Sequence, residues 1–526
     1  MSRHVAAGQA LARLADAVLI PPFPSRQAPA WLLAALADGL GGVTLFGPNI
    51  SGQGQLAGLV AALRSAAEEP VIAIDEEGGD VTRIAHLTGS PYPGNAALGA
   101  VDDPALTEAV YHALGAQLAA LGINLDLAPS ADVNTVSDNP VIGTRSFGAD
   151  TALVSRHAAA AVTGLQAAGV AACAKHFPGH GSTSIDSHHA LATVDAPMEL
   201  LARRDLPPFA AAIGAGVRAV MPGHLRVPAL TGDLPASLSG PALTGLLRGE
   251  LGFTGVIVSD ALEMRAVSRP YGLAEAAVLA VAAGTDLLCL GRDVDRRGYL
   301  TVRDALADAV SSGRLPGTRL EEAAARVAEL RSWAAARKPP GFGIAMARGP
   351  VQGRVQPGEN VGLAAARRAV LVAGTPQRLS DPLVVELVPP AGMAVGMVPW
   401  GLSRWVPSTS IRRVSTDRSP GADGRATADV QTALGTADGV LAEAAGRSLV
   451  IVVRDAHRYP PAAQEALRRL LAARPDAVLV EMGLPIWRPH AATYLATFGA
   501  ASVSGLAAAE ILGLHIELGT HGPDRP

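Results

Sequence analysis

The sequence predicts an α/β protein with an N-terminal (β/α)8 barrel of the TIM type, followed by a smaller C-terminal αβ sandwich domain. Eight short apolar runs alternate with Ala/Leu-rich segments over the first 290 residues, as in such a barrel. Polar residues stand where several of these runs end. Residues 338–361 contain prolines and glycines without periodicity and predict a linker, which divides the chain into domains at 1–337 and 362–526.

The apolar runs are short and end at turn-forming or charged residues, which favours strands. The strands are expected at 16–20, 42–46, 71–75, 123–127, 170–175, 218–221, 255–259 and 286–290. Helices are expected between most of them, at 29–37, 56–67, 106–121, 151–168, 207–215 and 273–283. An open doubly wound sheet is the alternative for such alternation, and the number of strands favours the barrel.

The polar strand ends are the stronger argument for a barrel. They are Asp75, Asp132, Lys175, His176, His224 and Asp260. In a barrel, the carboxyl ends of the strands converge on one face, where active sites are built. The sequence therefore predicts that these side chains gather at one site.

Fewer sequence patterns predict strands and helices in the C-terminal domain. Strands are expected at 366–373, 382–387, 448–453 and 477–481, with an amphipathic helix at 462–473. Residues 406–428 are polar and are expected to form a loop.

Composition limits the classes of protein. The 526 residues are 49% hydrophobic and 17% charged, which indicates a globular chain, and the net charge of −4 gives no reason to expect a nucleic-acid partner. Cys173 and Cys289 lie in apolar runs and predict buried thiols in a reducing compartment. Residues 1–24 lack the form of a signal peptide, and 158–174 is better explained as a buried helix running into a strand than as a membrane span. We expect a cytoplasmic monomer or homodimer with no membrane partner, cofactor or metal.

The segment from Lys175 to His188 has the densest group of titratable side chains in the sequence. It contains a lysine, three histidines and Asp186 around two glycines and a proline that prevent regular helix or strand. Titratable groups on a hinged loop favour catalysis. A metal site is the rival explanation, but the spacing fits no helical His pair and Lys175 would place a cation beside the metal.

Asp260 ends the apolar run of 255–259. An aspartate in this place can be an aligned nucleophile, or it can cap the next helix. The sequence pattern around Asp260 alone does not decide between these roles.

Several motifs together resemble glycoside hydrolase family 3, and within it the bacterial β-N-acetylglucosaminidase branch. The resemblance spans roughly residues 10–335. It is carried by 75–79 (DEEGG) with Arg83, by 139–148 (NPVIGTRSFG), by 175–188 (KHFPGHG followed by DSH), by 221–224 (MPGH), by 235–239 and by 258–264 (VSDALEM). Two residues depart from the family pattern: Glu76 stands where Gln is usual and Asp80 where Arg is usual. Both are expected to make the rim near Asp75 more acidic.

The resemblance implies a role for each matching residue. Asp260 would be the nucleophile, His188 the acid/base, and Asp186 the group that orients His188. The sugar would be bound by Asp75, Arg83, Arg145, Lys175 and His176. His224 would serve the substrate site, although for His224 and Asp132 an orienting or a purely structural role is equally open. His180 and His189 are expected to be structural loop residues.

The implied activity is that of a retaining exo-β-N-acetylglucosaminidase acting on a carbohydrate, either muropeptide fragments from peptidoglycan recycling or chito-oligosaccharides. A phosphorylase using the same site, a substrate-assisted enzyme using Asp75 and Glu76, and a sugar-binding protein are the alternatives. All catalytic candidates precede residue 265, so the first domain is expected to carry the chemistry. Arg454, Asp455 and His457 are the group in the second domain that could contradict this.

Overall fold

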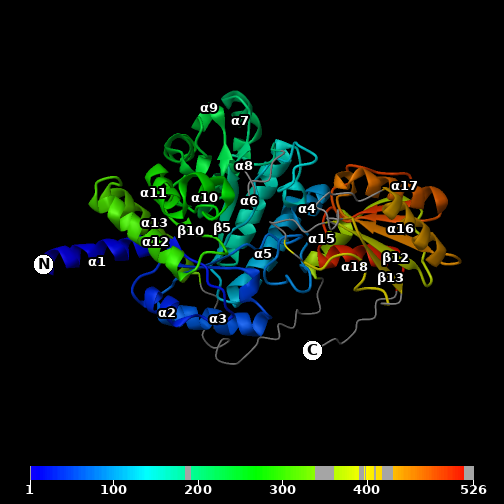
Figure 1. The fold of residues 1–526 in the computed structure, drawn as a ribbon, viewed down its shortest axis with the longest axis horizontal. Coiled ribbons are helices and arrows are strands. Elements are labelled where there is room, and N and C mark those ends of the chain that lie inside the picture. Colours follow the sequence, from blue (N-terminus) through cyan, green and yellow to red (C-terminus); the bar gives the residue numbers. More distant parts are fainter. Residues whose placement is uncertain are drawn as a thin grey trace. The chain divides into compact units, whose positions relative to one another are not determined.

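The computed structural model describes residues 2–183, 191–337, 360–389, 396, 398–407, 410–416 and 430–514. The chain forms two compact units (Figure 1). The first unit comprises Met1–Glu77, Val81–His86 and Asp102–Gly358. The second comprises Gly78–Asp80, Leu87–Val101 and Glu359–Pro526. Most of the expected linker lies outside the described residues, so the domain boundaries at 337 and 362 stay a prediction.

A curled parallel sheet forms the centre of the first unit. Six of its strands pair in the order β2 (Gly42–Leu45), β3 (Val71–Ile74), β4 (Leu125–Asp126), β5 (Ala171–Phe177), β7 (Ala219–Pro222) and β9 (Val256–Ile257). β1 (Leu19–Ile20) and β10 (Leu288–Cys289) form a parallel pair. This pair joins both ends of the sheet, because Val258 bridges Leu287 and the Thr44 N–H donates to the Pro21 carbonyl at 3.3 Å. The predicted α/β class, with a curled parallel sheet and a separate C-terminal αβ domain, is confirmed, and each strand expected before residue 291 overlaps an observed one.

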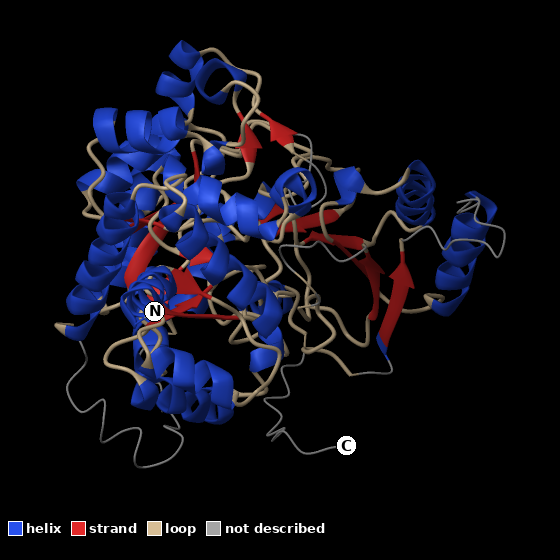
Figure 2. Ribbon diagram, turned by 60° about the vertical axis from the view of Figure 1, so that its left-hand side comes forward, coloured by secondary structure: helices blue, strands red, loops and turns tan. Residues whose placement is uncertain are grey.

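Helices surround this sheet, as Figure 2 shows. They are α1 (Ser2–Asp16), α2 (Ala30–Ala37), α3 (Gln53–Ala66), α5 (Pro104–Ala120), α6 (Thr151–Ala167), α7 (Met198–Arg204), α8 (Leu206–Gly214), α9 (Pro228–Thr231), a π-helix (Pro241–Glu250), α10 (Arg265–Tyr271), α11 (Leu273–Ala283), α12 (Arg296–Ser311) and α13 (Gly317–Ala335). α5 and α6 begin at the aspartate caps Asp103 and Asp150, whose carboxylates accept the Leu106 and Leu153 N–H groups. A short pair, β6 (Ala192–Thr193) and β8 (Leu225–Arg226), lies apart from the main sheet. Both cysteines are buried free thiols, as expected.

The second unit is built on a mixed sheet. Its strand order is β11 (Leu371–Gly374), β16 (Thr493–Ala496), β15 (Val478–Glu481), β14 (Leu449–Val453), β12 (Leu383–Val388) and β13 (Ile411–Ser415), with only the β11–β16 pair antiparallel. Its helices are α4 (Asn95–Val101), α15 (Val361–Ala369), α16 (Val430–Glu443), α17 (Pro461–Ala473) and α18 (Ser502–Ile511).

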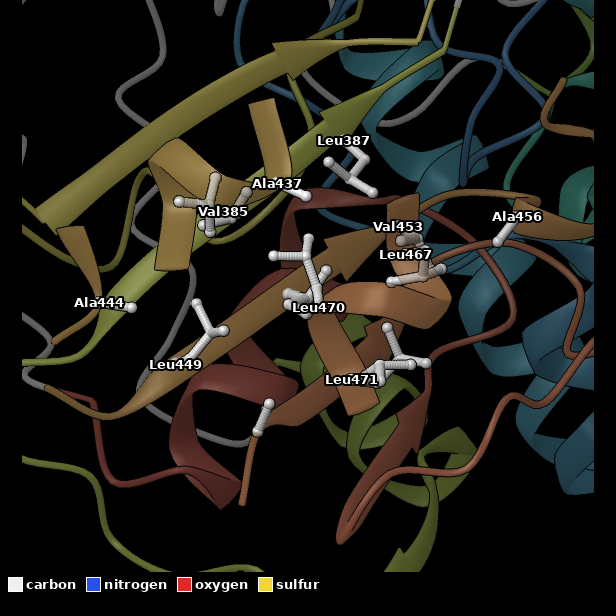
Figure 3. Packing of buried hydrophobic residues seen from close by; sticks show 14 of the residues in the cluster. Val385, Leu387, Ala437, Ala444, Leu449, Val453, Ala456, Leu467, Leu470 and Leu471 are labelled. Carbon is white, nitrogen blue, oxygen red and sulfur yellow. The ribbon is translucent and has the colours of Figure 1, made fainter. Parts of the chain in front are cut away.

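Alternate residues of the strands face two different cores. Ile451 packs in a cluster with Leu467 and Leu470 of α17, whereas its neighbour Val450 packs with Ala508 of α18. Figure 3 shows the first cluster, in which residues of α17 lie beside those of β14. The sheet is therefore covered on both faces, which explains its uninterrupted apolar strands.

Two local expectations were wrong. Residues 366–369 belong to α15, and only Leu371–Gly374 forms a strand. The alanines favour helix, the Asn360 side chain caps the first turn, and Arg367 and Arg368 lie at the carboxyl end, where cations stabilise a helix. The expected loop at 406–428 contains β13, an edge strand whose two arginines mask its pattern.

The core that joins α17 to the sheet should be sensitive to truncation. Leu470→Ala removes a buried side chain and leaves a cavity, so we expect a loss of about 2–5 kcal/mol in the free energy of unfolding. Denaturant unfolding followed by circular dichroism measures it. Ile486→Ala is the control, because that side chain is 43% exposed and should cost less than about 0.5 kcal/mol. Equal losses for both variants would contradict the described packing.

Candidate active site

Three charged side chains extend the rows of residues that point to the inner side of the curled sheet. The buried core takes alternate residues from three strands, namely Val71 and Ala73, Ala171 and Cys173, and Val256 and Val258. Asp75, Lys175 and Asp260 each come two residues later, so they point the same way at the carboxyl ends. The sheet itself thus brings the predicted nucleophile and two predicted sugar-binding residues to one place.

The Lys175 amine is the centre of the site. It is buried, and its Nζ lies 2.7 Å from Asp75 Oδ1 and 2.7 Å from Glu77 Oε1. Burial alone would lower the pKa of Lys175, but the carboxylates of Asp75 and Glu77 raise it above its ordinary value. The amine therefore stays charged at neutral pH.

Glu77 links this lysine to Arg145. Its Oε1 accepts from Arg145 Nη2 at 2.7 Å and its Oε2 from Arg145 Nε at 2.9 Å, in a two-pronged contact. Burial would raise the pKa of Glu77, but Arg145 and Lys175 hold it well below its usual range. No role for Glu77 was predicted. The period-2 alternation that places Asp75 inward also places Glu77 inward, and this signal could have identified it.

His176 is held in one orientation by Asp132. Its Nδ1 lies 2.7 Å from Asp132 Oδ2, and Arg145 Nη2 lies 3.2 Å from its Nε2. Burial opposes ionisation of Asp132, yet the nearby His176 lowers the pKa of that carboxyl. With Asp132 ionised, the His176 Nδ1 proton is donated to it, and Nε2 is left as the acceptor that faces Arg145. Of the two roles left open for Asp132, this geometry supports the orienting one.

The loop after His176 is tied to the same carboxylate. Asp132 Oδ1 accepts the His180 N–H at 2.6 Å, and Ser130 Oγ donates to Oδ2 at 2.9 Å. The His180 ring lies 2.7 Å from Thr183 Oγ1 through Nδ1, and burial lowers its pKa to about 4. His180 is thus a neutral, buried part of the loop, which supports the structural role expected for it.

Arg83 reaches the same region from the loop after β3. Its Nη2 lies 3.8 Å from Asp75 Oδ2. The Glu76 carboxylate accepts the backbone N–H groups of Arg83 and Ile84 at 2.8 and 3.0 Å, and burial raises the pKa of Glu76. The expectation of an acidic rim was wrong, because Glu76 and Asp80 are both buried and their carboxylates bind other protein groups.

Asp126 supports the turn after Asp75 from the opposite face of the sheet. Its Oδ1 accepts the Glu76 N–H at 3.0 Å, and burial raises the pKa of this carboxyl well above its ordinary value. It fixes the backbone of the Asp75 turn without facing the inner side of the curled sheet. Sequence reasoning gave it no role, because an Asp inside an apolar run has no local partner to reveal it.

His224 contacts the chain that carries Asp260. Its Nδ1 lies 2.7 Å from Ser237 Oγ and its Nε2 lies 3.0 Å from the Ala261 carbonyl oxygen. This geometry supports the orienting role left open for His224, while a contact with substrate stays a prediction.

Asp260 itself is partly exposed, and its Oδ1 accepts the Ala261 N–H at 2.8 Å. Asp186 and His188 lie outside the described residues, as does His189. Within the described ranges, no group of His, Cys, Asp and Glu side chains is arranged to hold a metal ion. None of the described helices combines the length and apolar character that a bilayer crossing requires.

The family follows from a direct match. Residues 23–330 match the family model described as the glycosyl hydrolase family 3 N-terminal domain. The chain belongs to glycosyl hydrolase family 3. The resemblance found in the sequence motifs is thereby confirmed, and the residues of the charged cluster all lie within the matched region.

Relatives of this family share much of the chain. Beta-hexosaminidase A of Pseudoalteromonas piscicida is 35% identical over 318 residues, which cover 56% of this chain and 53% of that protein. The chain thus spans about half the length of this relative. Beta-hexosaminidase LpqI of Mycobacterium tuberculosis is 38% identical over 49% of this chain and 67% of its own length.

Two solved structures of similar proteins match different shares of the chain. A glycoside hydrolase family 3 β-N-acetylglucosaminidase from Paenibacillus sp. FPU-7 superimposes with a TM-score of 0.80 at 31% identity, covering 96% of this chain and 97% of that one. The β-N-acetylhexosaminidase of Beutenbergia cavernae, also 31% identical, covers 61% of this chain and 98% of its own, with a TM-score of 0.55.

Glu77→Gln tests the electrostatic core of the family site. The change leaves Lys175 and Arg145 with too little negative charge, so we expect a loss of about 3–5 kcal/mol in the free energy of unfolding at pH 7. Because the pKa of Glu77 is depressed in the fold, its contribution is present at neutral pH and lost as the pH falls. The loss caused by Glu77→Gln should therefore shrink toward pH 3.

Denaturant unfolding at pH 7 and at acid pH measures this dependence. Glu275→Gln is the matched control, because Glu275 pairs with Arg314 on the surface and should cost at most about 1 kcal/mol. A pH-independent loss for Glu77→Gln, or one no larger than the control's, would refute the role given to Glu77.

Proposed function

We propose that this protein is a retaining exo-β-N-acetylglucosaminidase. Asp260 is its nucleophile, and His188, oriented by Asp186, is its acid/base. The observation that carries the proposal is the charged cluster around Lys175 at the carboxyl ends of the strands, with Asp260 on the same inward alternation. Relatives named β-hexosaminidase and β-N-acetylglucosaminidase support the class of substrate.

The cluster suits a sugar because it offers fixed, ionised partners for hydroxyl groups. Asp75 accepts hydrogen bonds while Lys175, Arg145 and Arg83 donate them, and charge-assisted bonds of this kind are short and directional. His176 presents one defined nitrogen, since Asp132 fixes its ring. The terminal sugar is bound here, with its anomeric carbon facing Asp260.

The reaction runs in two steps. The Asp260 carboxylate attacks the anomeric carbon while His188 gives its proton to the departing oxygen, and a covalent glycosyl-enzyme forms. His188, now neutral, then takes a proton from water, whose oxygen displaces Asp260. An imidazole suits both steps because it titrates near neutral pH.

The substrates we propose are muropeptide fragments of peptidoglycan recycling or chito-oligosaccharides, and the site of action is the cytoplasm. A substrate-assisted mechanism through Asp75 and Glu76 is disfavoured, because Glu76 is buried against the backbone of Arg83 and Ile84. The direct test is hydrolysis of a nitrophenyl N-acetyl-β-glucosaminide, with and without phosphate. A sugar 1-phosphate product would indicate a phosphorylase, and binding without turnover would indicate a sugar-binding protein.

Asp260→Ala should abolish turnover of the nitrophenyl substrate in a folded protein, since no other group would form the covalent intermediate. A fluorosugar that traps the glycosyl-enzyme should label Asp260, and the peptide is identified by mass spectrometry. A label on another carboxylate, or a product with inverted anomeric configuration, would overturn the assignment.

His188→Ala should slow hydrolysis of natural disaccharides by roughly 10²–10⁴-fold. The loss should be smaller on nitrophenyl sugars, whose leaving group departs with little protonation. The comparison of kcat/KM on the two kinds of substrate measures it. If both rates fell equally, His188 would have a structural role instead.

A further inference from the structure

We infer that Asp80 is a positioning residue for the substrate pocket, acting through the hairpin at Gly78–Val81. The inference rests on the proposed function and adds a residue to it. Asp80 lies on the short segment between Glu77 and Arg83, yet with Gly78 and Gly79 it belongs to the second compact unit. The segment between Asp75 and Arg83, which are both proposed to bind the sugar, thus has a tip whose contacts belong to the second unit.

The hairpin is a tight turn, and its tip leaves no room for a side chain at Gly79. At its base, the Glu77 N–H donates to the Val81 carbonyl at 3.1 Å. At its tip, the Gly79 N–H donates to the Tyr92 carbonyl at 2.9 Å. Gly79 has a φ of +58°, and a Cβ there would lie 2.4 Å from Gly94 Cα. The tip is therefore in backbone contact with the 92–94 segment of the second unit.

Asp80 adds a charged anchor to this backbone contact. Its carboxylate is buried, and Oδ1 accepts the Ala500 N–H at 2.7 Å. Oδ2 lies 3.2 Å from Arg454 Nη2, and the Arg454 guanidinium lies over the Trp400 ring at 5.9 Å from its centroid. Arg454 follows β14 and Ala500 follows β16, so the anchor spans the carboxyl ends of two strands.

The anchor controls both sides of the hairpin. Glu77 and Arg83 are each three residues from Asp80, a span of at most about 10 Å of extended chain. The two sides move together, since Glu76 binds the backbone of Arg83. Freeing the tip should therefore loosen Asp75, Glu77 and Arg83 at once, although Asp80 touches none of the reacting atoms.

The test uses the full-length protein and four variants: Asp80→Asn, Arg454→Met, the double variant and Arg454→Lys. We expect each single change to raise KM for the nitrophenyl substrate by roughly 3–10-fold with little change in kcat. The double variant should be no worse than either single one, and Arg454→Lys should recover most of the affinity. Arg413→Met is the matched control, because it breaks another ion pair of the second unit, to the buried Glu386, at residues outside the hairpin.

A second readout does not depend on enzyme activity. Hydrogen exchange of peptides covering 75–86 should speed up in Asp80→Asn and Arg454→Met and stay at the wild-type rate in Arg413→Met. If the wild type fails to cleave the substrate but the exchange pattern holds, the proposed function fails and the anchor stands. Unchanged exchange and KM, an Arg413→Met effect of the same size, or variants of the pair that all fail to fold while Arg413→Met folds, would each overturn the inference.

Discussion

The buried amine of Lys175, held between Asp75 and Glu77, is the constraint on which the site depends. A buried cation is tolerated only when opposite charges contact it directly, because desolvation costs several kcal/mol per ion. Here the two carboxylates face the amine at 2.7 Å each, and Arg145 balances the second of them. The charges are thus neutralised as a group. That group forms only if β3 and β5 end at the same level of the sheet.

Side chains point alternately inward and outward along the strands, and this alternation places the charged residues together. It also explains which site residues could be predicted from the sequence. The eight expected strands overlap observed ones because each is an apolar run with a sharp end, a purely local signal. Asp75, Lys175 and Asp260 were found as strand ends. Glu77 was not predicted because it stands in an acidic run beside Glu76, and only the alternation along the strand distinguishes the two side chains. Asp126 was missed because its partner is the backbone of a neighbouring strand, which no local pattern encodes.

In the second unit, too, only elements with a clear local sequence pattern could be predicted. Its apolar strands β12, β14 and β15 were predicted, since both faces are covered and the runs are continuous. The edge strand β13 and the helix α15 were not predicted. Two adjacent arginines interrupt the apolar pattern of β13, and the alanine-rich run of α15 leads directly into the strand β11. The membership of Gly78–Asp80 and Leu87–Val101 in this unit rests entirely on contacts between distant parts of the chain.

That membership has a consequence for how the chain folds during synthesis. The hydrogen bond between the Ala500 N–H and Asp80 joins residues 420 positions apart. Contacts of such sequence separation form late, because the intervening chain must first be ordered. Domains generally fold in order of their emergence from the ribosome. Here residues 78–80 emerge long before Ala500, so Asp80 gains this hydrogen bond only after the strands of the second unit have been synthesised.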